Sequence, residues 1–234
     1  MARISDSKGR SDTNSGYARL FGNQRLGQLL SRVHATVIRT GNELEHIIQE
    51  ETPAHLKTSL DAILSNQGEL LPKSGLQVVF QCRMPGESGQ PGGTVDVAVF
   101  DHSNQKISVI ELKDGDTFDT KKSSGELESM KKFAQWISHK TGYSADYYFC
   151  SFNQDDKEAI VRGAKSRFDI KHAMTGRELC IILEIEYDTL REKRQNQQAE
   201  NLDYFLTELL KISEIRHAVE GLLKKPSRGE DEKR

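Results

Sequence analysis

Two short runs of alternating residues, joined by a polar turn, lie within residues 93–113 and constrain the fold more than any other part of the chain. In the first run, VDVAV at residues 95–99, valines alternate with other residues, which is the two-residue period of a strand. The segment DHSN at residues 101–104 is typical of a turn. The second run, ISVIELK, covers residues 107–113. The pattern therefore predicts a β-hairpin.

Charged residues stand at defined places in this hairpin. Glu111 and Lys113 are two residues apart, so they project from one face of the second strand, and antiparallel pairing brings Asp96 close to that face. Two carboxylates suit Mg²⁺, which prefers oxygen ligands. A neighbouring lysine can orient or help deprotonate a water and offset charge on a phosphate.

The alternative interpretation is a solvated strand edge, because a Glu-x-Lys triplet arises by chance about once in a chain of this length. Against it, Glu111 and Lys113 directly continue the apolar run from Ile107 to Ile110. Charges that continue a buried strand are costly unless they have a partner or a task. The pattern therefore favours an active site.

The same residues resemble a known signature. The signature of the PD-(D/E)XK nucleases resembles the arrangement here, in which Asp96 is followed by fourteen residues and then by Glu111-Leu112-Lys113. The segment VIELKDGDTFDTKK resembles type II restriction endonucleases within that superfamily. The specific part covers about twenty residues, and Val95 stands where the signature has proline. The resemblance implies that Asp96 and Glu111 hold Mg²⁺ and that Lys113 is the catalytic lysine.

The resemblance also suggests a role for Glu45. Such enzymes often carry a glutamate on an early helix that faces the metal site, and the segment TGNELEHIIQEE resembles that helix. The alternative is an ordinary capping-box carboxylate, with Asn42 as the N-cap. Both interpretations of Glu45 stay open on the sequence.

The remaining pattern predicts an α/β fold, with a mixed sheet flanked by helices, which suits a restriction-endonuclease-like core with additional N- and C-terminal helices. We expect N-terminal helices over about 17–40 and 42–51, and a short helix from Pro53. Three strands follow, one over 76–83 and two in the hairpin. After them we expect a helix over 126–140, a strand over 143–153, a short helix over 155–163, and mostly helix after 175. We expect a flexible arm at 1–16, one nuclease domain over 17–223 and a charged tail at 224–234. Within that domain the catalytic core covers about 42–175 and the C-terminal helical part 176–223.

Composition excludes several classes of protein. The chain of 234 residues has no apolar run long enough to span a membrane, no signal peptide, and three cysteines without CxxC spacing, so we expect a cytoplasmic protein without structural zinc. The motifs HExxH, GxxxxGK[ST] and GxSxG are absent from the sequence, which disfavours zinc, nucleotide-driven and serine hydrolases.

The net charge of −2 does not exclude DNA binding, because local basic clusters can contact phosphates beside an acidic metal site. Lys121 and Lys122 form one such cluster, and Arg162, Lys165 and Arg167, together with Lys171 and His172, form the densest one. The alternative for each cluster is a solvated helix face. Gln81 is a weaker candidate to reach a metal-bound water.

The resemblance implies a Mg²⁺-dependent, sequence-specific endonuclease of double-stranded DNA, a type II restriction enzyme. Such enzymes usually cut palindromes as C₂ dimers, so we expect a homodimer. A cognate DNA methyltransferase is expected in the same system, without a stable complex. The alternatives are another PD-(D/E)XK nuclease (repair, phage or junction-cleaving) or a non-catalytic DNA-binding protein of the same fold.

Overall fold

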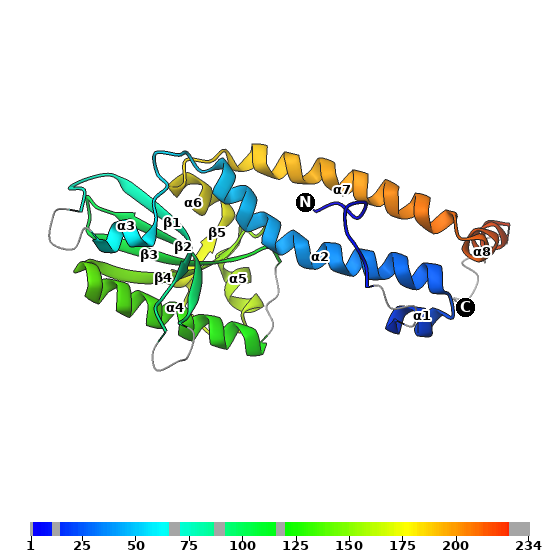
Figure 1. Ribbon diagram of the computed structural model, residues 1–234, viewed down its shortest axis with the longest axis horizontal. Helices are drawn as coiled ribbons and strands as arrows, with labels where there is room; N and C mark the ends of the chain where they lie inside the picture. The colour runs from blue at the N-terminus through cyan, green and yellow to red at the C-terminus, as the bar shows by residue number, and fades with distance from the viewer. Residues whose placement is uncertain (1, 11–14, 66–70, 87–91, 116–119, 225–234) are drawn as a thin grey trace, which may run out of the picture. The chain divides into compact units, whose positions relative to one another are not determined.

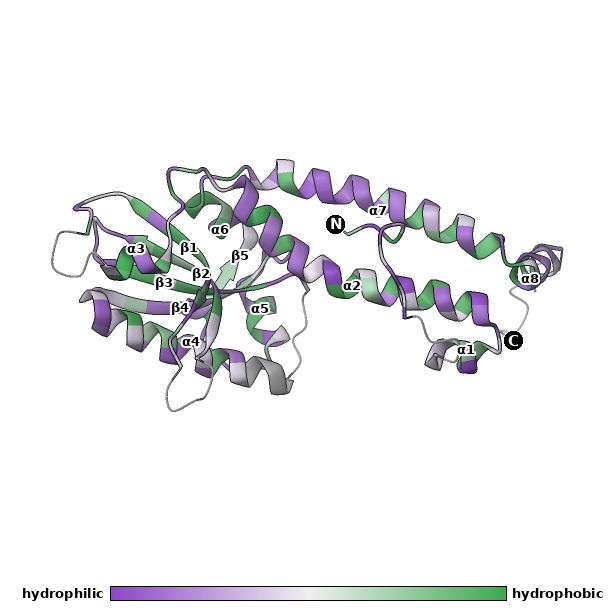
Figure 2. Cartoon of the chain, in the orientation of Figure 1, coloured by the Kyte–Doolittle hydropathy of each residue, from purple (hydrophilic) through white to green (hydrophobic). Residues whose placement is uncertain are grey.

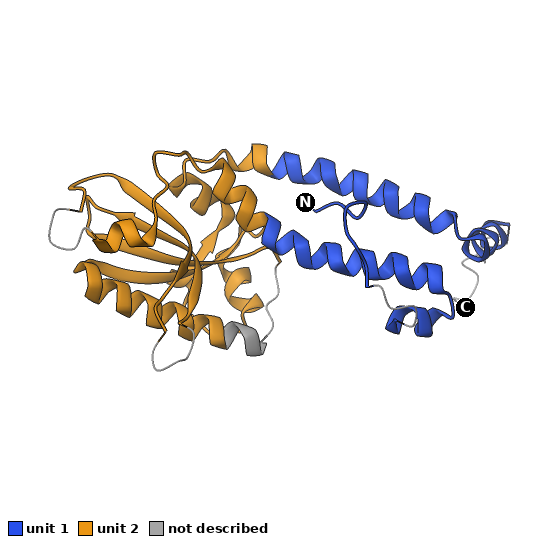
Figure 3. Cartoon of the chain, in the orientation of Figure 1, with its two compact units in different colours: residues 1–43, 191–234 blue, residues 44–190 orange. Residues whose placement is uncertain are grey.

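The computed structural model describes residues 2–10, 15–65, 71–86, 92–115 and 120–224, with backbone alone for 120–124. The chain forms two compact units, which Figure 3 shows in different colours. Unit 1 contains residues 1–43 and 191–234, and unit 2 contains residues 44–190. Two long helices, α2 (Gln24–Glu51) and α7 (Tyr187–Leu210), each have residues in both units.

Unit 2 is built on a mixed five-stranded sheet with the order β1-β2-β3-β4-β5 (Figure 1). Its strands are β1 (Leu76–Arg83), β2 (Thr94–Asp101), β3 (Lys106–Lys113), β4 (Ser144–Ser151) and β5 (Ala173–Thr175). The first three strands form an antiparallel meander, whereas β4 pairs parallel to both β3 and β5. The predicted mixed sheet and its hairpin are therefore confirmed.

Helices cover both faces of this sheet. On one face α3 (Leu60–Ser65), α4 (Thr120–Thr141) and α5 (Lys157–Gly163) contribute to a core that includes Phe100, Phe133 and Phe149. On the other face the C-terminal turns of α2, α6 (Gly176–Ile182) and the start of α7 contribute to a core that includes Leu44, Ile48 and Leu179. Apolar residues concentrate on the strands between these helices (Figure 2). The sheet therefore has no wholly solvated face.

The alternation of side chains shifts by one residue in the middle of β1 and β2. In β2 Val97 packs on the α2 face, yet Val95, two residues earlier, packs on the α4 face. The partner strand does the same, because Val79 and Cys82 both pack on the α4 face. Between these positions Gln81, which has a positive φ of 49°, stands opposite Asp96. A shift in two paired strands takes Asp96 out of the regular pattern of the sheet.

The helix boundaries near the N-terminus differ from the prediction. The predicted break at Gly41 is wrong, because α2 continues from Gln24 to Glu51. The break lies earlier, where α1 (Gly16–Phe21) ends at Gly22 with a φ of 62° and the side chain of Asn23 accepts a hydrogen bond from the amide of Leu26. Packing of the C-terminal turns of α2 against the sheet outweighs the cost of about 1 kcal/mol of a glycine within a helix.

Three other elements also differ from the prediction. The prediction of a helix that starts at Pro53 is wrong, because α3 begins at Leu60. Helix α4 begins at Thr120, six residues before the predicted start at 126. The sequence pattern also missed β5, which has three residues and follows a short 3₁₀ helix (Ile170–His172). The strand predicted over 76–83 has the observed bounds of β1.

Unit 1 contains α1, the N-terminal part of α2, most of α7, and α8 (Ser213–Leu223). The chain start packs within this unit: Ala2 and Ile4 are buried, and the amide of Ile4 donates to the side chain of Asn201 at 2.8 Å. The predicted flexibility of residues 1–16 and the division into one nuclease domain and a tail stay predictions. Among the helices that the structure describes, none is both long and apolar enough to cross a membrane.

Candidate active site

Asp96 lies where β2 and β3 separate. The ladder between these strands ends at the pair Val97 and Ile110. One residue further, the Oδ2 atom of Asp96 accepts a hydrogen bond of 2.7 Å from the backbone amide of Leu112. The side chain thus replaces a backbone partner, and this bond orients the carboxylate at the fork between the strands.

Glu111 and Lys113 face α4, on the same side of β3 as Ile107 and Val109. The Nζ atom of Lys113 lies 2.6 Å from Oε1 of Glu111 and 2.9 Å from Oε1 of Glu126. The three side chains keep only 20%, 10% and 15% of their surface exposed, respectively. The predicted neighbours on one strand face therefore form a largely buried ionic cluster, which Glu126 of α4 completes.

The sequence interpretation missed Glu126. Its one signal is position, because Glu126 continues the stripe of Met130, Phe133 and Ile137 that α4 buries against the sheet. A carboxylate on the buried stripe of a helix is expensive unless it meets a charge. That charge is Lys113, which the linear sequence places thirteen residues away.

The cluster carries more negative than positive charge. Burial, followed by the charge of Asp96, raises the pKa of Glu111 to about 7, although Lys113 acts in the opposite direction. Burial alone would lower the pKa of Lys113, but the carboxylates of Glu111 and Glu126 together outweigh it, so this pKa is raised. The lysine therefore keeps its proton at neutral pH, while the carboxylates gain from any further cation.

This donor set fits a hard divalent cation. Asp96 and Glu111 supply carboxylate oxygens, the ligand type that Mg²⁺ prefers, and their mutual repulsion is relieved when a cation binds between them. Among the described residues, no group of three or more His, Cys, Asp or Glu side chains is arranged to hold a metal. The protein would therefore supply two carboxylates, and water or phosphate oxygens would complete the shell.

Glu45 is half-buried on α2, one residue after Leu44, which packs against the sheet. The capping-box interpretation is wrong, because Asn42 lies inside α2 and caps no helix start. The catalytic role of Glu45 stays a prediction. Gln81 is exposed, and it is the residue opposite Asp96 that has a positive φ of 49°.

The predicted DNA-contacting residues have different surroundings. Lys121 and Lys122 lie in the first turn of α4, and their side chains are outside the described residues. Arg162 is exposed and pairs with Asp156 at 3.3 Å, while Lys165 and Arg167 are exposed after α5. His172 is buried, and its ring stacks on Tyr147 with centroids 3.9 Å apart, so it belongs to the packing of the sheet. The DNA contacts of Arg162, Lys165 and Arg167 stay predictions.

The sequence comparison shows the class of protein: the chain belongs to the type II restriction enzymes. It is 42% identical over 225 residues to the type II restriction enzyme HhaII of Haemophilus parahaemolyticus, and the alignment covers 94% of this chain and 98% of that protein. No family model matches the chain. No solved structure matches it significantly.

Proposed function

We propose that the protein is a Mg²⁺-dependent endonuclease of the PD-(D/E)XK superfamily that hydrolyses phosphodiester bonds at a specific sequence in double-stranded DNA. The observation that carries this proposal is the convergence of Asp96, Glu111 and Lys113 at the fork between β2 and β3. Family membership supports the substrate, since type II restriction enzymes cut DNA at defined sequences. The excess of carboxylates supports a divalent cation.

Asp96 and Glu111 would hold the metal. When bound, a divalent cation polarises the scissile phosphate and lowers the pKa of a coordinated water. The protein itself holds the carboxylate of Asp96 in place through the amide of Leu112. It also excludes solvent from Glu111, which strengthens every charge interaction at this point.

Lys113 acts as a cation and hydrogen-bond donor. Its raised pKa favours orienting the attacking water and offsetting charge on the phosphate, rather than removing a proton from the water. Glu126 positions this ammonium by accepting a hydrogen bond from one of its three N–H donors. Lys113 therefore has a fixed place beside Glu111 before DNA arrives.

The test is cleavage of plasmid and phage DNA with Mg²⁺ or with EDTA, by the native protein and by Lys113→Ala. We expect discrete Mg²⁺-dependent fragments that the substitution abolishes. Lys106→Ala is the matched control, because Lys106 is exposed at the opposite end of the same strand and should cut normally. Cleavage of branched DNA alone would instead indicate a junction nuclease, and binding without any cleavage would indicate a non-catalytic DNA-binding protein.

We also propose that two copies act on a palindromic site, so that one active centre meets each strand. Unit 1 supports a self-association surface, because α7 exposes Leu202, Leu206 and Leu210 along one face. A DNA methyltransferase that protects the same sequence would act in the same system, without forming a stable complex with this protein.

A further inference from the structure

Within unit 1, the segment at residues 2–10 packs against α2 and is hydrogen-bonded to it. The guanidinium of Arg32 donates hydrogen bonds to the carbonyl oxygens of Ile4, Ser5 and Ser7 at 3.0–3.3 Å. Gly9 lies so close to α2 that a Cβ there would meet the backbone nitrogen of Arg32 at 3.1 Å. The segment therefore has a defined path along the helix.

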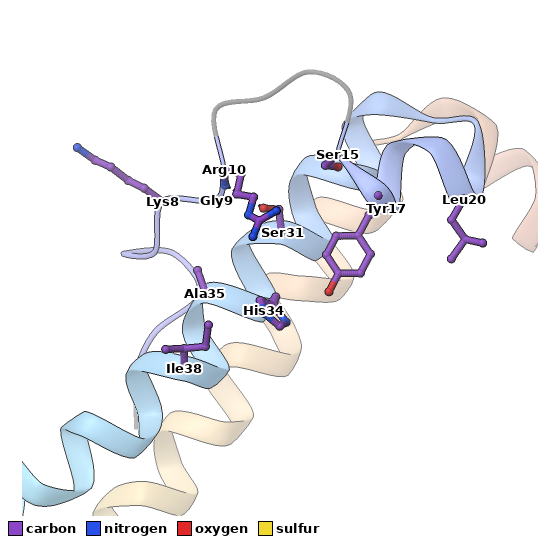
Figure 4. Close-up of a pocket in the computed structure, with 11 residues that line it drawn as sticks. Lys8, Gly9, Arg10, Ser15, Tyr17, Leu20, Ser31, His34, Ala35 and Ile38 are labelled. Carbon is purple, nitrogen blue, oxygen red and sulfur yellow. Dashed lines mark hydrogen bonds between the residues drawn. The ribbon is translucent and has the colours of Figure 1, made fainter. Parts of the chain in front are cut away.

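A cavity of about 560 Å³ lies between this segment, α1 and α2 (Figure 4). In the figure Arg10 and Ser31 lie side by side, the ring of Tyr17 extends from α1 toward His34, and Lys8 points away from them. The rings of Tyr17 and His34 are 6.3 Å apart. Arg10, Tyr17, Ser31 and His34 all carry hydrogen-bond donors, and none of the described residues that line the cavity is an aspartate or a glutamate.

The cavity belongs to a part of the chain with a net positive charge. Residues 1–43 contain seven Lys and Arg against three Asp and Glu, although the whole chain carries −2. Several of these cations are already engaged: Arg3 pairs with Glu200 at 3.0 Å, and Arg39 donates to the carbonyl of Asp6. Arg10 differs, since its exposed guanidinium forms no hydrogen bond or ion pair within the described residues.

Arg10 is nonetheless held by its backbone. Its amide donates a hydrogen bond of 2.8 Å to Oγ of Ser31, which is 5% exposed. That bond uses Ser31 as an acceptor, so the hydroxyl proton of Ser31 remains available to a ligand in the cavity. An arginine that is held by its backbone amide beside tyrosine and serine hydroxyls, with no carboxylate among the described lining residues, is the chemistry that recognises a phosphate.

We propose that this cavity binds a phosphate of the DNA backbone, as a contact of unit 1 in addition to the cleavage site of unit 2. The proposal rests on the proposed function, because it takes DNA as the ligand. Arg10 supplies the charge and the paired donors, and Tyr17 adds a neutral donor. A phosphate contact carries no sequence information, so this cavity strengthens binding to every duplex equally.

The test measures DNA affinity against salt concentration in the Lys113→Ala background without Mg²⁺, with duplexes that contain or lack the recognition sequence. Arg10→Ala should bind both duplexes about tenfold more weakly and reduce the slope of log K against log salt by about 0.9, the value for one lost phosphate contact. Tyr17→Phe should weaken binding without changing the slope, because a neutral hydroxyl displaces no counterion.

Arg3→Ala is the matched control, since it removes the same charge from the same segment but outside the cavity, and should leave the slope unchanged. If the Lys113→Ala protein binds DNA and the added Arg10→Ala substitution leaves the salt slope unchanged, the proposed phosphate contact of the cavity is overturned, but the proposed function is not. No DNA binding by the parent overturns the proposed function as well. Calorimetric binding of inorganic phosphate that Arg10→Ala abolishes, without any change in the DNA slope, assigns the cavity to free phosphate and overturns the DNA contact.

Discussion

At the scale of single residues, Asp96 illustrates how function and stability oppose each other. Its carboxylate is placed by the Leu112 amide next to Glu111, whose pKa is raised by burial and by the charge of Asp96 itself. Without a cation, this pair therefore destabilises the folded protein once Glu111 ionises. A site built to bind metal is expected to carry such repulsion.

Asp96→Asn tests this repulsion. The amide oxygen of asparagine still accepts from Leu112, but the charge is gone, so in EDTA at pH 8 the variant should be more stable by about 1 kcal/mol. The pKa of Glu111 is raised from 4.5 to about 7 by folding, so its ionisation lowers the free energy of unfolding at any pH above 4.5. The difference in free energy of unfolding between the two proteins should therefore shrink as the pH falls from 7 to 4.5. Urea unfolding at several pH values measures it, and a variant less stable than the native protein at pH 8 would contradict the prediction.

Glu126→Gln tests the positioning of Lys113. Glutamine keeps an acceptor for Nζ but removes the charge that holds it, so kcat should fall about tenfold while affinity for uncleaved DNA in Ca²⁺ stays the same. Glu128→Gln is the control, because Glu128 lies on the same helix but pairs with Lys132 in solvent. Equal kcat values for the Glu126 variant and the native protein would show that Glu126 does not position Lys113 for catalysis.

The site residues differ in how far the sequence reveals them. Strand periodicity places Glu111 and Lys113 on one face, and the pairing of the hairpin brings Asp96 near them, although the structure holds Asp96 outside the regular alternation. Glu126 comes from a helix beyond the hairpin, and only the packing of α4 on the sheet places it beside Lys113. The shift of alternation at Gln81 and Asp96 was likewise hidden, because no residue type marks it.

At the scale of elements, the long helices depended on packing that no local pattern shows. The strand over 76–83 was predictable because its apolar run ends at clear breakers, Pro72 to Gly75 and the MPGESGQPGG segment. The continuity of α2 was not, because Gly41 is a weak breaker that tertiary contacts override. The three residues of β5 are too few to show any period.

Two glycines of α2 provide a prediction about this helix. A Cβ on Gly27 would lie 2.6 Å from the backbone nitrogen of Ala18, so Gly27→Ala should displace α1 and destabilise the protein by about 1–3 kcal/mol. Beyond the backbone of its own helix, no atom of the described residues lies within 4 Å of a Cβ added to Gly41, so Gly41→Ala should instead stabilise the protein by about 1 kcal/mol. Urea unfolding of both variants measures these changes in stability. Equal changes for Gly27→Ala and Gly41→Ala would show that α1 does not pack closely on α2.

At the scale of the whole molecule, hydrophobic exposure is concentrated in one unit. Most large apolar residues that remain exposed belong to unit 1: Leu20, Phe21, Val37, Ile38, Leu202, Leu206, Leu210, Leu222 and Leu223. Figure 2 shows that α7 is mostly hydrophilic along its first turns and more apolar toward its end. An apolar face on a polar helix favours self-association there.

The dimer prediction follows from that face. Replacing both Leu206 and Leu210 with lysine should convert a particle of about twice 26.4 kDa into a monomer in light scattering. Val37→Lys is the control, because Val37 is also exposed, at 66% against 45% for Leu206 and 43% for Leu210, but lies on α2. A native protein that is already monomeric at micromolar concentration would contradict the proposed homodimer.

The division of the chain also has a consequence for its synthesis. Unit 2 is one continuous stretch, residues 44–190, whereas unit 1 is assembled from segments on either side of it. On the ribosome, the residues of the cleavage site therefore emerge as a complete set before the second half of unit 1 exists. The N-terminal segment meets Asn201 only after that point, so unit 1 is the last part of the enzyme to be completed.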